Sequence, residues 1–326
     1  MTSSKQLIAM IRSHAAGDDE RFLAIADHIA ADARKAGHHR MADEIGTLVG
    51  SLREETNERR PASKPTMIAA PRGELASLVR ASYPETRLSD VVLTSEVDKR
   101  LRRIVREHRE RGLLAERGLL PRRKILLSGP PGTGKSLTAA AIAGELNVPL
   151  FTVQLDGVIT KYMGETAAKL RMVFDAMQGA RGVYFFDEVD ALATRRGADN
   201  DVGEARRMLN SFLQFLDEDS SGSLILAATN HQELLDRAIF RRFEATVPYD
   251  LPPPDLVRRI LTQRLPQFDL LGVDWDTVSK AADGLSQADI VAAADDAARD
   301  AVLEASGMLT GDILLQALEV RRHPDR

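Results

Sequence analysis

The sequence predicts an α/β protein in which a parallel sheet carries helices on both faces. From about residue 88 onward, short apolar runs alternate with segments of helical spacing, a pattern typical of parallel strands joined by helices. After the prolines of Leu251–Pro254 the apolar runs stop, so a purely helical block is expected to follow the sheet. The first 60 residues show helical spacing alone and predict a small all-helical domain in front of the sheet.

Size and composition are those of a globular protein with two or three domains. The chain has 326 residues, of which 44% are hydrophobic and 28% charged, and its net charge of -4 gives no reason to expect nucleic-acid binding. The absence of cysteine excludes disulfides and thiolate metal sites. No apolar run approaches the ~20 residues that span a bilayer, and the first residues lack the apolar core of a signal peptide. We therefore expect a cytoplasmic protein without a membrane partner.

The domain boundaries follow from changes in composition. Residues 1–60 are expected to form a helical docking domain, and residues 61–87, which contain four prolines, a linker with one short helix near Glu74. The α/β domain is predicted over residues 88–252 and the helical block over residues 253–326.

Individual elements are predicted from apolar spacing and from helix-capping residues. The first helix of the α/β domain is expected over residues 95–112. Strands are expected near residues 124–128, 149–154, 182–187, 223–229 and 245–248. Helices of the last block are expected at about 255–265, 275–282, 287–306 and 311–320. Ser286–Asp289 has the form of a capping box and predicts the start of the longest of these helices.

Residues 129–136 read Gly-Pro-Pro-Gly-Thr-Gly-Lys-Ser and follow the apolar run Lys124–Ser128 directly. This is the pattern G-x-x-x-x-G-K-[ST] between a strand and a helix, which is the context of a phosphate-binding loop. The glycines let backbone amides turn toward an anion, and the helix N-terminus adds partial positive charge. Lys135 is expected to reach the β- and γ-phosphates, and Ser136 to offer its hydroxyl to Mg²⁺. A plain glycine-rich turn is the alternative.

A second nucleotide motif, Gly182–Asp190, argues against that alternative. Val183–Phe186 is predicted to be a strand buried on both faces, and it ends abruptly in two carboxylates. Because ligands of parallel sheets lie beyond the carboxyl ends of the strands, these carboxylates are expected to face the phosphate loop. Asp187 is expected to hold the Mg²⁺ shell and Glu188 to polarise the attacking water. Asp190 is left between a role in this site and a helix cap.

With these motifs the chain resembles the AAA ATPases, and more narrowly the single-ring members that remodel or unfold proteins. The resemblance covers roughly residues 88–326. It implies a P-loop NTPase fold with a five-stranded core and a C-terminal helical lid, and ATP and Mg²⁺ as ligands. It also implies ATP hydrolysis to ADP and phosphate by a homo-oligomer, usually a hexameric ring. The N-terminal module loosely resembles the front ends of stand-alone bacterial ATPases, which leaves a docking domain or a ring-stabilising appendage as alternatives.

The resemblance also assigns catalytic positions. Asn230 follows the strand Ser223–Thr229 and matches the polar residue that senses the γ-phosphate. Leu235–Phe243 matches the segment that presents arginines to the neighbouring subunit's nucleotide, with Arg241 and Arg242 as the two candidates. A guanidinium aimed at the γ-phosphate neutralises charge in the transition state, an effect of about 10³–10⁵ in rate. Which of the two arginines acts in this way is left open.

Further positions that the resemblance implies lie around the nucleotide. Asp90–Leu93 resembles the segment whose backbone contacts adenine, and Gly284 and Ala288 match small lid positions. The expected metal-holding residues are Ser136 and Asp187. The complete expected ATP-binding set is Asp90, Val91, Val92, Gly129, Pro130, Pro131, Gly132, Thr133, Gly134, Lys135, Ser136, Gly284 and Ala288.

The segment Lys161-Tyr162-Met163-Gly164 resembles the central-channel loop that grips polypeptide substrates. An aromatic ring beside a thioether can hold an extended chain by dispersion, without reading its sequence. The favoured function is therefore an unfoldase that threads polypeptide through a ring. Since the sequence contains no H-E-x-x-H, G-x-S-x-G or cysteine nucleophile, any protease belongs to a separate partner chain. The alternatives are an ATP-dependent switch or scaffold without translocation and, less favoured, a nucleic-acid motor.

Overall fold

The computed structural model describes Ala30, Pro71 and residues 73–159, 163–192, 201–234, 237–304 and 307–322. The chain divides into two compact units, Met1–Lys64 and Pro65–Arg326. Apart from Ala30, which is helical, the predicted N-terminal helical domain lies outside the described residues, so that domain stays a prediction. All other described residues belong to the second unit.

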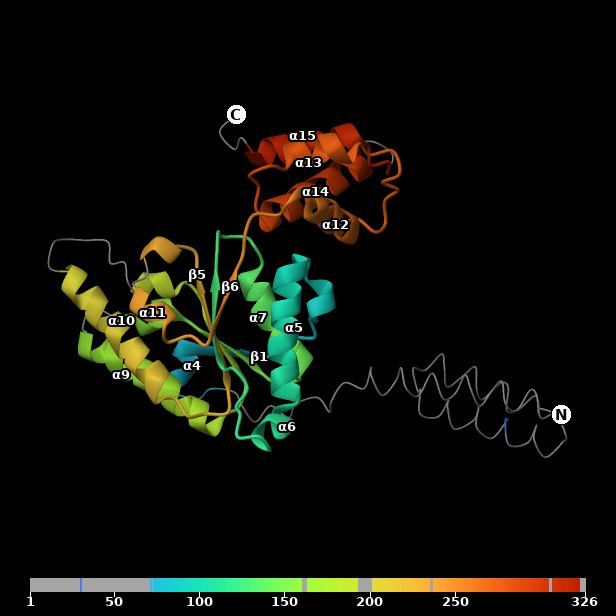
Figure 1. Ribbon diagram of the computed structural model, residues 1–326. Helices are drawn as coiled ribbons and strands as arrows, with labels where there is room; N and C mark the ends of the chain where they lie inside the picture. Colours follow the sequence, from blue (N-terminus) through green and yellow to red (C-terminus); the bar gives the residue numbers. More distant parts are fainter. Residues whose placement is uncertain are drawn as a thin grey trace. The chain divides into compact units, whose positions relative to one another are not determined.

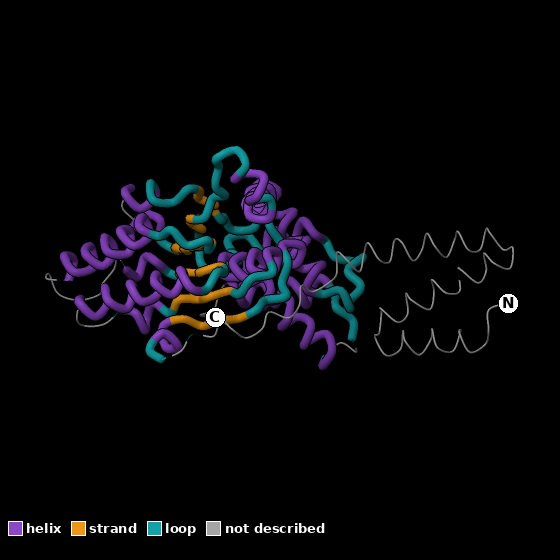
Figure 2. The backbone as a smooth tube through the Cα atoms, turned by 90° about the horizontal axis from the view of Figure 1, so that it is seen from below, coloured by secondary structure: helices purple, strands orange, loops and turns teal. Residues whose placement is uncertain are grey.

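The second unit is built on a six-stranded sheet of order β1-β3-β4-β5-β2-β6 (Figures 1 and 2). Five of its strands are parallel and agree with the predicted strands to within two residues at each end. They are β2 (Lys124–Ser128), β3 (Leu150–Val153), β4 (Val183–Phe186), β5 (Leu224–Thr229) and β6 (Ala245–Pro248).

The sixth strand, β1 (Val79–Ser82), was not predicted and lies in the expected linker. It pairs antiparallel with β3, from Val79 opposite Val153 to Ser82 opposite Leu150. The helix expected near Glu74 is the single turn α4 (Leu75–Leu78) just before it. A strand of four residues at a sheet edge, with a single fully buried side chain, leaves too short an apolar pattern to be recognised in the sequence.

Helices cover both faces of the sheet (Figure 1). One face carries α5 (Ser95–Arg109) and α7 (Lys135–Leu146), and the other carries α9 (Met163–Gly179) and α10 (Asp201–Glu218). The helix expected over residues 95–112 is interrupted at Glu110, and a short α6 (Arg111–Ala115) follows it. The remaining helices of the α/β part are the single turns α8 (Leu155–Val158) and α11 (Arg237–Phe240).

Alternation along the central strands builds two separate cores. Ile125 and Leu127 of β2 face α5 and α7, whereas Leu126 between them joins the cluster under α9 and α10. On the latter side Phe186 of β4 packs its ring 5.2 Å from that of Phe212. The strands are therefore buried on both faces, as their continuous apolar runs predict.

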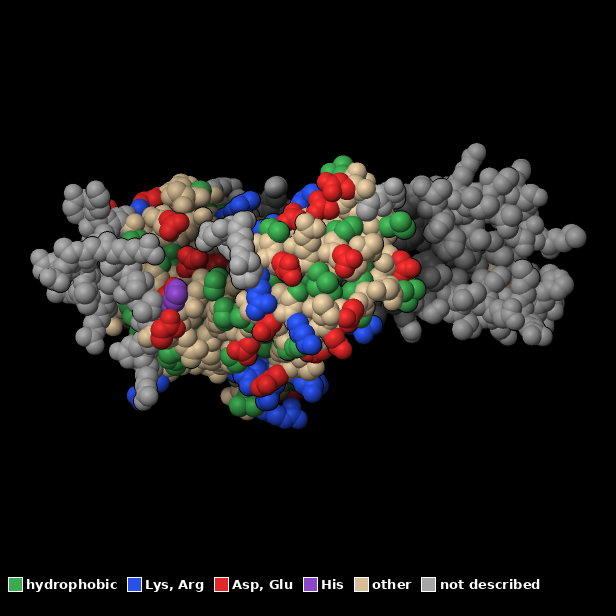
Figure 3. All heavy atoms as spheres, turned by 90° about the horizontal axis from the view of Figure 1, so that it is seen from above, with side chains coloured by type: hydrophobic (Ala, Val, Ile, Leu, Met, Phe, Trp, Pro, Cys, Tyr) green, Lys and Arg blue, Asp and Glu red, His purple; other side chains and the backbone are tan. Residues whose placement is uncertain are grey.

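The helical block has the predicted composition of four helices and its own core. These are α12 (Pro254–Arg264), α13 (Trp275–Ala281), α14 (Gln287–Leu303) and α15 (Gly311–Arg322). The capping box is confirmed, because the Asp289 amide donates to Ser286 Oγ at 3.2 Å and the Ser286 amide donates to Asp289 Oδ2 at 3.1 Å. Val92 of the α/β part also packs into this third core. Acidic and basic side chains are interspersed over the helical block on the face seen in Figure 3.

Within the described ranges, none of the helices is long and apolar enough to cross a membrane.

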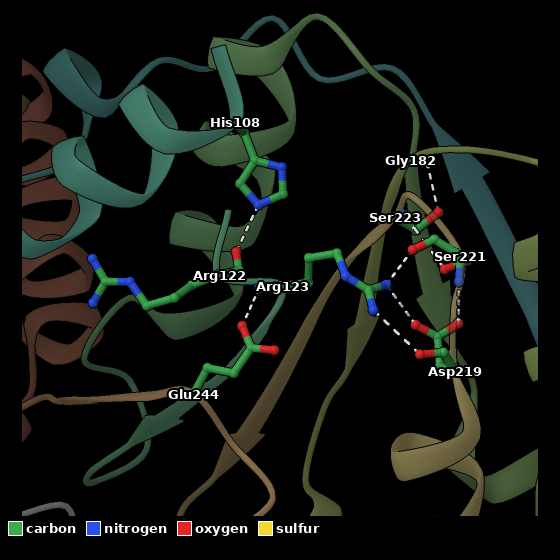
Figure 4. Close-up of polar contacts among 8 residues, drawn as sticks. All are labelled: His108, Arg122, Arg123, Gly182, Asp219, Ser221, Ser223 and Glu244. Atoms are coloured by element: carbon green, nitrogen blue, oxygen red, sulfur yellow. Dashed lines mark hydrogen bonds and ion pairs between the residues drawn. The ribbon is translucent and has the colours of Figure 1, made fainter. Parts of the chain in front are cut away.

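A buried ion pair joins three chain segments at the amino-terminal edge of the sheet (Figure 4). Arg123 donates to Asp219 Oδ2 at 2.8 Å and also to the Ser221 carbonyl oxygen, while its backbone amide donates to Glu244 Oε2 at 2.6 Å. The Asp219 side chain has no exposed surface and that of Arg123 is 17% exposed. Removing one partner of such a pair leaves a charge buried without compensation.

We therefore expect Arg123→Ala to lower the free energy of unfolding by about 3 to 5 kcal/mol, measured by urea denaturation. The matched control is Arg102→Ala, which breaks the exposed pair with Asp98 and is expected to cost less than about 1 kcal/mol. Equal losses for the two variants would contradict this account of the Arg123–Asp219 pair.

Candidate active site

The loop between β2 and α7 turns tightly enough to need glycine at particular positions. Gly129 has φ 148° and Gly132 has φ 72°, both in the region that L side chains avoid. A Cβ atom at Gly129 would lie 1.9 Å from the Tyr249 carbonyl oxygen, and one at Gly132 would lie 2.4 Å from Ser286 Oγ. Helix α7 then begins at Lys135. The predicted loop, 129–136, thus connects strand to helix in the expected context.

Lys135 is held within this loop by the loop's own backbone. Its Nζ atom donates to the carbonyl oxygens of Gly129 and Pro130, both at 2.8 Å, and the residue is only 5% exposed. Burial lowers the pKa of the Lys135 ammonium, and the nearby carboxylates, Asp187 first among them, oppose this shift. The geometry presents a compact positive charge beside the glycine-rich turn, which suits a phosphate ligand.

Two oxygen ligands for a hard cation lie together at the same edge. Ser136 Oγ donates to Asp187 Oδ2 at 2.8 Å, joining the start of α7 to the end of β4. A hydroxyl and a carboxylate are donors that Mg²⁺ prefers, and Mg²⁺ takes its remaining ligands from water and phosphate oxygens. Among the described residues no group of three or more His, Asp or Glu side chains could hold a metal by itself. The pair therefore fits a magnesium ion that arrives with a nucleotide.

Glu188 adopts a left-handed backbone conformation, with φ 53°. Its amide donates to Asp187 Oδ1 at 3.0 Å, and its carbonyl oxygen accepts from the Ala191 amide at 2.8 Å. These bonds turn the chain sharply at the end of β4, into the 3₁₀ turn Val189–Leu192. The turn leaves the Glu188 side chain exposed to the cleft.

Asp190 positions Asn230 across the sheet. The buried Asp190 carboxylate accepts from the Asn230 backbone amide at 3.2 Å through its Oδ1 atom. The sequence does not predict this contact, because no pattern in it relates two residues that are 40 positions apart. Asn230 follows β5 directly, so the segments after three neighbouring strands, β4, β5 and β2, supply site residues at the carboxyl ends of the strands.

One cleft of about 890 Å³, its open mouth included, collects most of the predicted residues. Three of its lining residues, Leu137, Gln287 and Val291, were not predicted; they come from the faces of α7 and α14 that no motif marks. Predicted residues that line it are Pro131, Gly132, Gly134, Lys135, Ser136, Asp187, Glu188, Asn230 and Ala288. Gly284 is not among the lining residues; it lies in the turn before α14 with φ 83°.

The start of α14 lies directly on the phosphate loop. The Ala288 amide donates to the Gly132 carbonyl oxygen at 2.9 Å. The Gln287 side-chain amide donates to the Val92 carbonyl oxygen at 3.2 Å. The helical block is therefore hydrogen-bonded both to the phosphate loop and to the segment that precedes α5.

The predicted adenine segment borders a second, smaller cavity of about 540 Å³. Val92 lines this cavity together with Tyr249, and Thr133 and Gln287 place it next to the phosphate loop. Val91 is buried in the core under α5 and α7. The Asp90 carbonyl oxygen accepts from Gln263 at 2.9 Å, which ties this segment to α12 as well. An adenine ring here would lie between the α/β part and the helical block.

The two candidate arginines differ in their surroundings. Arg242 forms an ion pair with Asp217 of α10 at 2.9 Å, whereas Arg241 is exposed and has no ion pair within the described part of the chain. Neither residue lines the cleft of its own chain.

The predicted channel loop is only partly within the described residues. Lys161 and Tyr162 lie outside them. Met163 is the first residue of α9, and Gly164 is exposed in its first turn. In chain order this segment falls between α8 and α9, within the connection from β3 to β4.

We expect Gly132→Ala to lower nucleotide affinity at least about tenfold, because the added Cβ would collide with Ser286 and displace α14 from the loop. The matched control is Gly284→Ala, which imposes similar backbone strain at φ 83° but meets no atom within 4 Å. Titration with a fluorescent ATP analogue should show affinity within about threefold of wild type for that control. Equal losses in both variants would contradict the steric argument.

Comparisons with known proteins agree with this geometry. Residues 125–251 match the model of the ATPase family associated with various cellular activities (AAA). The uncharacterized AAA family ATPase y4kL of Sinorhizobium fredii (strain NBRC 101917 / NGR234) is 36% identical over 293 residues, which cover 88% of this chain and 86% of that protein. The ATP-dependent zinc metalloprotease FtsH of Lancefieldella parvula is 37% identical over 207 residues, which cover 61% of this chain and 32% of FtsH.

The crystal structure of the FIGL-1 AAA domain has the same fold, with a TM-score of 0.61 and 23% identity over 79% of this chain and 92% of that domain. Together, the phosphate loop, the acidic end of β4 and the extended similarity to y4kL establish that this chain belongs to the AAA family and is an ATPase.

Proposed function

We propose that this ATPase is a protein remodeller that threads polypeptide through the pore of a homohexameric ring. The observation that carries the proposal is the convergence of Lys135, Ser136, Asp187, Glu188 and Asn230 on one cleft. In this proposal hydrolysis in that cleft moves the predicted channel loop, which belongs to the connection between the neighbouring strands β3 and β4.

In the proposed site each residue has a separate task. The glycine-rich loop and Lys135 hold the phosphates, and Ser136 and Asp187 hold Mg²⁺, which neutralises charge on the β- and γ-oxygens when it is bound. Glu188 orients and polarises the attacking water. Asn230, fixed through its backbone by Asp190, reports on the γ-phosphate. The contact between Ala288 and Gly132 carries that state to the helical lid.

A neighbouring subunit completes the site in this proposal. Between the two candidates, Arg241 is the better donor in trans because no described carboxylate engages it, whereas Arg242 is held by Asp217 of its own chain. A guanidinium free of intrachain pairing reaches a neighbour's γ-phosphate without first breaking an ion pair.

We expect Arg241→Ala to reduce ATP turnover by about 10³-fold or more, and Arg242→Ala to reduce it far less. Mixing Arg241→Ala with Lys135→Ala subunits should restore hydrolysis at about a quarter of the interfaces, because each such interface combines an intact loop with an intact arginine. A phosphate-release assay on rings shown to be mixed by mass spectrometry measures this. No recovery in confirmed mixed rings would argue against a shared site.

The relatives support the remodelling part of the proposal. Several are ATP-dependent zinc metalloproteases named FtsH, of which this chain matches about a third to a half. Because this sequence contains no H-E-x-x-H, we propose that a separate protease chain degrades any substrate that it unfolds.

We expect Tyr162→Ala to keep ATP turnover within about twofold while abolishing the unfolding of a tagged fluorescent substrate. The physical reason is that the aromatic ring supplies most of the dispersion contact with an extended chain. Tyr83→Ala, a change of the same type near β1, serves as the control and should leave unfolding intact. Retained unfolding in Tyr162→Ala, or ATP turnover indifferent to any polypeptide, would instead favour a switch or scaffold without translocation.

A further inference from the structure

A groove of about 1130 Å³ lies at the amino-terminal edge of the sheet, opposite to the edge that holds the nucleotide cleft. Its lining includes the chain just before β2 and the turn Ser220–Gly222 just before β5. Nothing in the nucleotide site reaches this edge, because the phosphate loop, Asp187 and Asn230 all follow the carboxyl ends of their strands. The groove therefore requires a separate explanation.

The floor of the groove is fixed by buried polar contacts (Figure 4). Arg123 holds Asp219 in the buried ion pair, and the Ser221 amide donates to Asp219 Oδ1 at 3.1 Å. The Ser223 amide donates to Ser221 Oγ at 3.3 Å, and Ser223 Oγ in turn accepts from the Gly182 amide at 3.2 Å. A floor with this many satisfied contacts is preorganised, so a ligand would not have to order it.

The charge that remains accessible in the groove is positive. Its ionisable lining residues are His108, Arg111, Arg123, Arg181 and Asp219. Arg123 and Asp219 neutralise each other, and burial lowers the pKa of His108, whose Nε2 contacts the Arg122 carbonyl oxygen at 2.7 Å. Arg111 and Arg181 are exposed, and neither has an ion pair with any described residue. Two guanidinium groups thus face the groove without a carboxylate of their own.

The same groove has an apolar side. Ala115, Leu120 and Pro121 line it, and Leu120 is 80% exposed. Leu113 and Leu119, each 55% exposed, lie in the same short stretch of chain around α6. Three leucines are thus exposed within eight residues of a segment that lines the groove, and exposed apolar side chains gathered in this way are typical of interaction sites.

We propose that this groove docks an extended, acidic, leucine-bearing segment of a partner protein. Carboxylates of the segment would pair with Arg111 and Arg181, and its leucine side chains would cover Leu120 and Pro121. The choice of occupant rests on charge complementarity: two unpaired guanidinium groups beside an apolar wall favour carboxylates next to aliphatic side chains. Since the site lies at the opposite edge from the cleft, its occupant leaves nucleotide access free, as a substrate-delivering or anchoring partner requires.

The test is fluorescence anisotropy on the full-length protein with a short labelled peptide of Asp, Glu and Leu in a Gly-Ser frame. Two matched peptides replace either the acidic residues by Gln and Asn or the leucines by Ser. We expect binding of the first peptide only, weakened at least about tenfold by Arg111→Glu combined with Arg181→Glu, and similarly by Leu120→Asp. Arg80→Glu and Leu271→Asp, at exposed positions outside the groove, should leave binding unchanged, as should Tyr162→Ala.

ATP turnover within about twofold of wild type verifies that the groove variants are folded. Failure of the acidic peptide to bind, or binding that ignores the groove variants, would overturn the proposal. Equal binding of the leucine-free peptide would show that the groove binds anionic groups without recognising leucine, and this result would also overturn the proposal. A change of oligomeric mass in Leu120→Asp, measured by light scattering, would show that a second copy of the chain covers the groove, and the partner segment would then be wrong.

Discussion

The parallel register of three adjacent strands is the constraint on which this molecule depends. β5 lies between β4 and β2, with Thr229 opposite Ser128 and Ala227 opposite Phe186. This register brings the phosphate loop, the acidic turn and Asn230 to one edge, although Asp187 lies 51 residues after Ser136 and Asn230 a further 43 residues along the chain. The hydrogen bond between Ser136 and Asp187 spans that edge and joins the segments that follow the two flanking strands, β2 and β4. Slipping any one of the three by a single residue would also turn its side chains to the wrong face.

The lid depends on the same edge through main-chain atoms. Because the Ala288 amide bonds to the Gly132 carbonyl oxygen, the contact between lid and loop is insensitive to the side chain at position 288 beyond the need for a small one. Capping by Ser286 and Asp289 fixes where α14 begins, and so fixes which amide meets the loop. Loop and lid are thereby coupled through an amide of the first turn of α14, a group that has no acceptor within the helix.

Much of this arrangement could be predicted from the sequence, for identifiable reasons. Four of the parallel strands, β2 to β5, are almost wholly buried, so each appears as a largely apolar run, and the two nucleotide motifs follow strands directly. The antiparallel β1 could not be predicted, because its pairing with β3 depends on residues about 70 positions away and only Val79 within it is fully buried. The contact from Asp190 to Asn230 and the lining by Gln287 and Val291 were missed for the same reason: they arise from tertiary packing. Gly284, which the resemblance implies at the nucleotide, lies in the turn before α14 with φ 83°, and its role there stays a prediction.

The left-handed backbone of Glu188 sets stability against activity at one position. In the described residues only Asn147 and Glu188 combine a side chain with positive φ, and asparagine tolerates that region far better than glutamate does. The strain at Glu188 is of the order of 1 to 2 kcal/mol, and glycine would relieve it at once. A glycine at position 188 would thus make the fold firmer and leave it without its proposed water-activating carboxylate. Selection for thermal stability alone would therefore favour glycine at position 188. Retention of glutamate in that turn requires selection for ATP turnover.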